Sequence, residues 1–181
     1  MPSDGVRALQ HERVIANMVI GSNGATSLHQ DSAPLSPPAD RERFHAIRRL
    51  ASCLVVGGNT YRCEHYSKAP LPVFVATRNP EIFAEQYPSS QGESFFIKAA
   101  PESVVNEAIA AKGGVVLVEG GISFISPLLR TKLIDRLFLT RSPIEGDGDF
   151  FNFEELRHNY SLARSEDVLD VTFEEWVPIR D

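Results

Sequence analysis

Short apolar segments recur along the first two thirds of the chain, and each one ends in a glycine or a polar turn. They are rich in valine and isoleucine and shorter than an average helix, which is typical of buried strands. Helical segments fall between them, the clearest being "PESVVNEAIAAKGG", which has a proline in its first turn and a glycine stop. Strands that alternate with helices predict a parallel sheet with both faces covered. The strand segments are 13–20, 53–61, 72–80, 94–98 and 114–121.

The pattern changes after residue 131. Three segments, 133–144, 160–169 and 171–179, read as strands with few helices between them, which favours an antiparallel edge. The expected fold class is therefore α/β, with a mainly parallel central sheet, helices on both faces and an antiparallel C-terminal edge. Residues 13–181 are expected to form a single domain, and the polar segment 1–12 is expected to be a flexible leader.

A helix is expected after Pro37 and Pro38, with Asp40 as its N-terminal cap. Its apolar residues, among them Phe44 and Ile47, fall on one stripe. The loop 28–40 before this helix is long and rich in proline, and long loops in compact domains often carry function. Four arginines lie mostly off the apolar stripe, on a face that is either solvated or in contact with an anionic substrate: Arg41, Arg43, Arg48 and Arg49.

Composition excludes several classes of protein. A formal net charge of −6 does not provide the basic surface that nucleic-acid binding requires. No apolar run reaches the roughly 18–20 residues that span a bilayer. The two cysteines, Cys53 and Cys63, cannot build a disulfide framework or a zinc site, so no metal is expected, and free thiols favour the cytoplasm.

Three strand ends carry residues that suit phosphate binding: "GGNTY" after Val56, "TRNP" after Ala76 and "EGG" after Val118. In open α/β sheets, ligands bind beyond the carboxyl ends of the strands. Glycine lets backbone N–H groups approach a phosphate, and the helix that follows points its positive end at the same place. Three such joints predict an extended, multiply phosphorylated ligand such as a dinucleotide, although the usual Rossmann fingerprint G-x-G-x-x-G is missing.

Several motifs, in their order and spacing, resemble the reductase domain of the bifunctional riboflavin-biosynthesis deaminase-reductase family over about residues 13–177. They are a serine turn after the first strand, an arginine-ending helix before a G-x-x-T turn, E-G-G, and an aspartate that opens the next strand. The first turn has an asparagine where the family has an acidic residue, and the motifs of the deaminase half, H-x-E and P-C-x-x-C, do not occur. The motifs fall on Ser22-Asn23-Gly24, Arg48, 57–61, Glu119-Gly120-Gly121 and Asp135.

The resemblance implies the dihydrofolate reductase fold and an NADPH-dependent reduction of the ribose of 5-amino-6-(5-phosphoribosylamino)uracil to a ribityl chain. It also implies a homodimer packed through its late strands, and a cis peptide between Gly120 and Gly121. The residues that it places at the NADPH phosphates are Gly57, Gly58, Thr60, Gly120, Gly121, Ile122 and Ser123, with Thr77 and Arg78 at the adenosine 2′-phosphate. It places Asn17, Ser22 and Asn23 beside the nicotinamide and the substrate.

The chemistry needs a proton at oxygen as well as a hydride at carbon. Glu119 is the first candidate, either as a proton relay or as a hydrogen-bond acceptor for the ribose hydroxyls, and Asp31 and His29 come next. The substrate's phosphate needs a basic partner, for which Arg48 is a candidate together with Arg49 and Arg41.

Two alternatives stay open. The first is dihydrofolate reductase activity on a pterin, which requires a carboxylate on the first helix facing the ring; Glu42 is the only acid expected inside that helix. The second is a non-catalytic nucleotide-binding or dimerisation module that keeps the fold without the substrate pocket.

Overall fold

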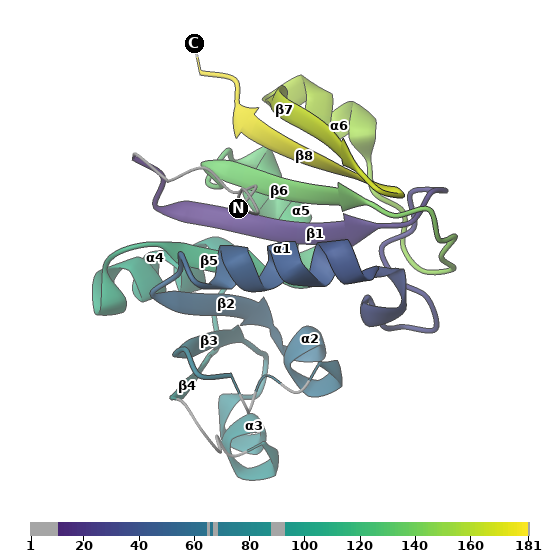
Figure 1. Cartoon of the computed structure of the whole chain (residues 1–181). Coiled ribbons are helices and arrows are strands. Elements are labelled where there is room, and N and C mark those ends of the chain that lie inside the picture. The colour runs from purple at the N-terminus through teal and green to yellow at the C-terminus, as the bar shows by residue number, and fades with distance from the viewer. Residues whose placement is uncertain (1–10, 65, 67–68, 88–92, 181) are drawn as a thin grey trace.

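The computed structural model describes residues 11–64, 66, 69–87 and 93–180, and eight strands of these residues form one sheet (Figure 1). The strand order is β4-β3-β2-β5-β1-β6-β8-β7. The strands from β4 to β6 run parallel, and antiparallel pairing adds β8 and then β7 at the C-terminal edge, which confirms the predicted fold class. The bounds are β1 Val14–Ile20, β2 Cys53–Gly57, β3 Val73–Ala76, β4 Ser94–Ile97, β5 Val116–Glu119, β6 Arg136–Arg141, β7 Tyr160–Val168 and β8 Val171–Pro178.

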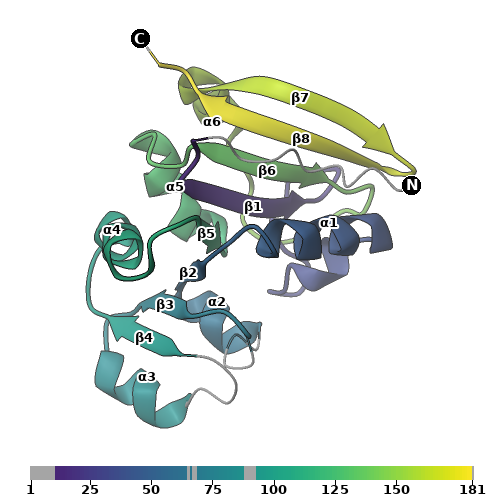
Figure 2. The same cartoon turned by 60° about the vertical axis from the view of Figure 1, so that its left-hand side comes forward.

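Helices cover both faces of the sheet. One face packs against α4, α5 and α6, and the other packs against α1, α2 and α3, so that α1 and α4 lie on opposite sides in Figure 2. Side chains alternate along a strand, and on β1 this puts Ala16 in one core cluster and Ile15 in the other. None of the described helices is long and apolar enough to cross a membrane. The bounds are η1 Ala33–Leu35, α1 Pro38–Arg48, α2 Gly58–Cys63, α3 Pro80–Gln86, α4 Pro101–Lys112, α5 Ile122–Arg130 and α6 Phe153–Asn159.

Two helices were not predicted. α2 begins at Gly58, where the sequence indicated only a glycine turn. α6 lies among the late strands, and its N-cap Asn152 accepts a hydrogen bond of 3.0 Å from the backbone N–H of Glu155. An N-cap residue followed three positions later by glutamate is a helix-start signal, so α6 was predictable from this pattern.

α5 runs without a break through Pro127, although proline inside a helix often kinks or ends it. Pro127 is the sixth residue of the helix, so its missing N–H removes one intrahelical bond, the one to the carbonyl of Ser123. The helix also buries an apolar face that stabilises it, made of Phe124, Ile125, Leu128 and Leu129.

Two residues of α1 lie where the sequence did not predict them. Asp40 is not the N-cap; it is the third residue of the helix, is 4% exposed and accepts a hydrogen bond from the Ser36 hydroxyl. Arg43 is buried, not solvated, and donates to the carbonyl oxygens of Leu139 and Glu174 at 3.3 Å each. Burial lowers the pKa of Arg43 to about 10, because no carboxylate pairs directly with it among its described contacts.

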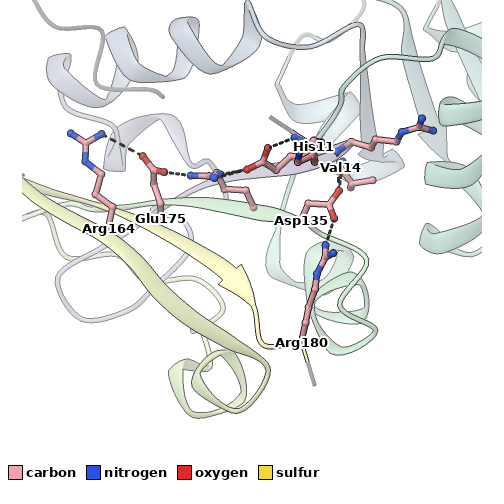
Figure 3. Close-up of polar contacts among 9 residues, drawn as sticks. His11, Val14, Asp135, Arg164, Glu175 and Arg180 are labelled. Atoms are coloured by element: carbon pink, nitrogen blue, oxygen red, sulfur yellow. Dashed lines mark hydrogen bonds and ion pairs between the residues drawn. The ribbon is translucent and has the colours of Figure 1, made fainter. Parts of the chain in front are cut away.

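A polar network holds the amino ends of β1 and β6 together (Figure 3). Asp135 serves the fold: its Oδ2 accepts hydrogen bonds from the backbone N–H groups of Arg13 and Val14 at 2.9 and 3.0 Å, and its Oδ1 accepts one from the Arg180 guanidinium at 3.1 Å. Beside it, Arg136 pairs with Glu175 at 2.5 Å and with Glu12. The expected leader lies outside the described residues up to position 10, and Glu12 is already attached to the sheet.

We expect Asp135→Ala to lower the free energy of unfolding by about 1–3 kcal/mol, because it leaves the part-buried N–H of Val14 and the exposed N–H of Arg13 without their acceptor. Denaturant unfolding measures the loss. Asp170→Ala, in the exposed β7–β8 turn, is the control and should stay within about 0.5 kcal/mol of the unmodified protein. Equal stability of the two variants would contradict the role of Asp135.

Candidate active site

A cleft of about 740 Å³ opens at the carboxyl ends of β1, β2 and β5. The three predicted phosphate joints follow β3, β2 and β5, which are neighbours in the sheet, so the expectation that they lie side by side is confirmed. The cleft brings together most of the residues predicted for the site: Asn17, Gly57, Gly58, Thr60, Glu119, Gly120, Gly121, Ile122 and Ser123.

The two glycine joints meet each other in the cleft wall. Gly120 has a φ of 132°, a conformation that residues with a side chain rarely adopt, and a Cβ added there would lie 3.0 Å from Thr60 Oγ1. Gly121 is the N-cap of α5, and a Cβ added to it would meet no described atom within 4 Å, because it would extend into open space. The implied cis peptide is not found: none of the described peptide bonds is cis, and the positive φ of Gly120 makes the turn instead.

Glu119 is held by three donors. Its Oε1 accepts a hydrogen bond from Arg48 Nε at 2.9 Å. Its Oε2 accepts hydrogen bonds from Arg48 Nη2 at 2.7 Å and from the Tyr66 hydroxyl at 2.5 Å. The carboxylate side chain is 3% exposed and that of Arg48 is 25% exposed. We call these three residues the Glu119 clamp. The clamp joins the end of β5, the end of α1 and the segment after α2.

The clamp fixes the protonation of its donors. Burial acts to lower the pKa of Arg48, but the hydrogen bonds and charge of Glu119 outweigh it and raise that pKa above the usual value. Burial, followed by the negative charge of Glu119, raises the pKa of Tyr66 well above its usual value, so the hydroxyl stays protonated and donates. The clamp occupies three of the roughly four lone-pair sites of the carboxylate, so a proton relay through Glu119 would use the remaining site on Oε1.

Five predicted site residues do not line the cleft. Arg48 points at Glu119 and not into the cleft, so its guanidinium is already engaged. Thr77 and Arg78 lie beyond the end of β3, outside the walls of the cleft. Their role at the 2′-phosphate stays a prediction.

Ser22 and Asn23 form a cross-link between two loops. The amide of Asn23 donates to Gly146 O at 2.9 Å and its oxygen accepts Gly146 N at 3.2 Å, while Ser22 N donates to Ile144 O at 3.0 Å. An aspartate could not donate to Gly146 O, which gives the asparagine at this position a physical reason. Thr26 and Ser27 of the same loop line the cleft instead.

The cleft also contains polar residues that the sequence did not single out. Asp40 was missed because it was assigned to the cap, and it lines the cleft from inside α1. Glu64, whose Oε1 accepts the Ser32 hydroxyl at 2.9 Å, lines it beyond α2, and Asp149 lines it beyond β6. Asn17, paired in register with Glu119, has a buried Oδ1 without a hydrogen-bond partner among the described residues, so it is available to a ligand donor.

Residues 13–145 match the family model of the RibD C-terminal domain. Because that match covers most of the chain, the chain belongs to the RibD C-terminal domain family. Among curated proteins, none matches the chain significantly.

Solved structures share the fold at low sequence identity. The diaminohydroxyphosphoribosylaminopyrimidine deaminase/5-amino-6-(5-phosphoribosylamino)uracil reductase of Thermotoga maritima matches with a TM-score of 0.73 and 16% identity, over 93% of this chain and 57% of that one. This chain therefore spans little more than half of that protein. A pyrimidine reductase-like protein of Corynebacterium diphtheriae matches with a TM-score of 0.67 and 19% identity, over 94% of this chain and 93% of that one.

A dihydrofolate reductase of Enterococcus faecalis, complexed with NADP(H) and a second ligand, matches with a TM-score of 0.70 and 18% identity, over 93% and 97% of the two chains. Identities of this size show the fold alone. The fold is dihydrofolate reductase-like, as predicted.

Substitutions at the two adjacent glycines, Gly120 and Gly121, test folding and ligand binding separately. We expect Gly120→Ala to destabilise the protein by about 1–3 kcal/mol, since alanine is strained at its φ and Thr60 is close. Gly121→Ala should keep the thermal stability but weaken NADPH binding, because the added methyl would enter open cleft space. Thermal unfolding and fluorescence titration with NADPH measure the two effects. Unchanged NADPH affinity of a stable Gly121→Ala protein would contradict a dinucleotide at this joint.

Breaking the Glu119 clamp should destabilise the fold. Glu119→Gln removes the charge that pairs with Arg48, and we expect a loss of roughly 3 kcal/mol, at the low end for buried pairs because Arg48 is a quarter exposed. Urea unfolding measures it, with Glu42→Gln on the exposed side of α1 as the control. A Glu119→Gln protein as stable as the control would show that the clamp is dispensable.

Proposed function

We propose that this chain is an NADPH-dependent reductase that converts the ribose of 5-amino-6-(5-phosphoribosylamino)uracil to a ribityl chain. Family membership supports the reaction class. The observation that carries the proposal is the pair of glycine joints that meet at the cleft, with space at Gly121 that a Cβ would fill. The unpaired oxygen of Asn17 in the same wall supports a ligand with hydrogen-bond donors.

These residues fit the cofactor. Backbone N–H groups at Gly57, Gly58 and Gly120 to Ser123 would hold its phosphates, and Thr60 lies beside Gly120. Bound NADPH supplies the hydride. The protein orients the sugar carbonyl, limits the access of water and supplies a proton at the carbonyl oxygen.

Glu119 keeps two proposed roles. Through the clamp it positions the glycine turn, and a relay of protons through the remaining lone-pair site of Oε1 would be a second role. Turnover of the Glu119→Gln variant separates the two, at a temperature where that variant is folded. Full turnover would dismiss the relay and leave the positioning role.

One observation favours the dihydrofolate-type alternative. Asp40 is a buried carboxylate inside α1 that lines the cleft, which is the kind of residue that this activity requires and that Glu42, exposed on the helix, does not provide. A carboxylate there can accept two N–H groups of an aminopyrimidine or a pteridine ring. The site therefore suits both kinds of heterocycle, and an assay has to decide between them.

The assay follows the absorbance of reduced nicotinamide with each substrate. We expect turnover with the phosphoribosylamino-pyrimidine and none with dihydrofolate. Turnover with dihydrofolate alone would replace the proposed substrate by a pterin. NADPH binding without turnover on either would leave a non-catalytic nucleotide-binding module, and no NADPH binding would reject the proposal.

Two further properties belong to the same proposal. We propose a homodimer formed through the late strands, which the edge position of β7 and the half-exposed Leu162 support. We also propose a cytoplasmic location, which the free thiols of Cys53 and Cys63 support.

A further inference from the structure

The acidic side chains that line the cleft come from several segments, whereas the basic ones come from a single helix. The acidic residues of the cleft come from four different segments: Asp40, Glu64, Glu119 and Asp149. Among the described residues that line it, only Arg41 and His45 have basic side chains, and both belong to α1. A phosphorylated substrate in this cleft therefore has one basic wall available to it.

The other arginines of this segment are engaged or point elsewhere. Arg43 is buried against β6 and β8, with its guanidinium 4.5 Å from the centre of the Phe173 ring. Arg48 is bound in the Glu119 clamp. Arg49 is the C-cap of the helix, is exposed and does not line the cleft. Of the basic residues of α1, Arg41 and His45 are therefore the two that face the cleft.

Arg41 and His45 are four residues apart on one helix, so they lie on the same face, one turn from each other. Phe44 also lines the cleft and packs edge-on against the His45 ring, with 5.6 Å between centroids. The Arg48 guanidinium lies 4.2 Å from the centre of the Phe44 ring. Phe44 therefore contacts both the clamp and His45.

We propose that Arg41 and His45 form the subsite for the phosphate monoester of the substrate, an assignment that rests on the proposed function. A phosphate monoester carries nearly two negative charges at neutral pH. The planar fork of an arginine binds two of its oxygens, and a histidine N–H can donate to a third. Both side chains are exposed, as suits the outer end of a substrate whose ring lies deeper, toward Asp40.

This subsite is separate from the joints that would hold the cofactor. Ile122 and Ser123 begin α5, which packs on one face of the sheet, whereas α1 packs on the other together with α2, which begins at Gly58. The cofactor phosphates would meet backbone N–H groups at the glycines, and the substrate phosphate would meet the side chains of α1. Substrate and cofactor phosphates therefore do not compete for the same groups.

The test compares Arg41→Gln and His45→Gln with the control Arg49→Gln, an arginine of the same helix outside the cleft. Steady-state kinetics use the phosphorylated substrate and its dephosphorylated form. We expect Arg41→Gln to raise KM for the phosphorylated substrate by about 10- to 100-fold with kcat nearly unchanged, and His45→Gln to raise it by several-fold. Neither should change KM for the dephosphorylated form, and Arg49→Gln should change nothing. Equal effects on both substrates, or none, would overturn the subsite while leaving the reductase activity established.

A second measurement does not depend on turnover. Calorimetric titration with ribose 5-phosphate, with ribose as its uncharged control, measures the subsite directly. We expect binding of ribose 5-phosphate to be weakened by Arg41→Gln and retained in Arg49→Gln. If no substrate is turned over but this pattern is found, the proposed function fails and the phosphate subsite stands. If ribose 5-phosphate binds the unmodified protein and Arg41→Gln equally well, the subsite is wrong.

Discussion

The buried pairing of Glu119 with Arg48 is the interaction on which the site depends. A carboxylate at the end of an apolar strand is strongly destabilising unless donors satisfy it. Arg48 and Tyr66 supply three hydrogen bonds, and they come from two other elements whose loops wall the cleft. One buried charge thus fixes the distance between β5, α1 and the segment after α2.

The clamp also explains why the glycine turn follows directly. Gly120 adopts a backbone conformation that is unfavourable for other residues, next to Thr60 of the neighbouring joint. Such a turn persists where the flanking residues are held rigidly. Glu119 is the residue immediately before it, so the clamp places the turn and the first residues of α5, Ile122 and Ser123, which line the cleft.

The sheet and the places of the three proposed phosphate joints were predictable because they follow from local patterns. Apolar runs, glycines and helix signals determine which segments become strands and where each one ends, and parallel pairing then brings the ends together. The positions of Arg43 and Asp40 were not predictable in this way. Arg43 leaves the solvent because β6 and β8, about a hundred residues further along the chain, provide carbonyl oxygens and the ring of Phe173.

The same limit applies to the loops. The family resemblance placed Asn23 beside the substrate, but its amide is occupied by Gly146, which approaches only when β6 pairs with β1. Arg48 was a candidate for the substrate's phosphate because it is one of the basic residues of the first helix, and its actual partner is the glutamate of another motif. A sequence motif therefore locates the edge at which a site forms, and tertiary contacts decide which of its residues remain free for a ligand.

This division would let a chain with a net charge of −6 bind the anionic ligands proposed for it. Three of the four acids in the cleft are engaged by donors of the protein: Ser36 for Asp40, Ser32 for Glu64 and the clamp for Glu119. Engaged carboxylates have part of their charge offset locally, so they repel a phosphate less than free ones. Among the described residues, no carboxylate forms an ion pair with Arg41 or His45, and these two side chains line the cleft together with the glycine joints. The local field that a phosphate meets is therefore set by these few groups within a Debye length of about 8 Å, and much less by the total charge of the protein.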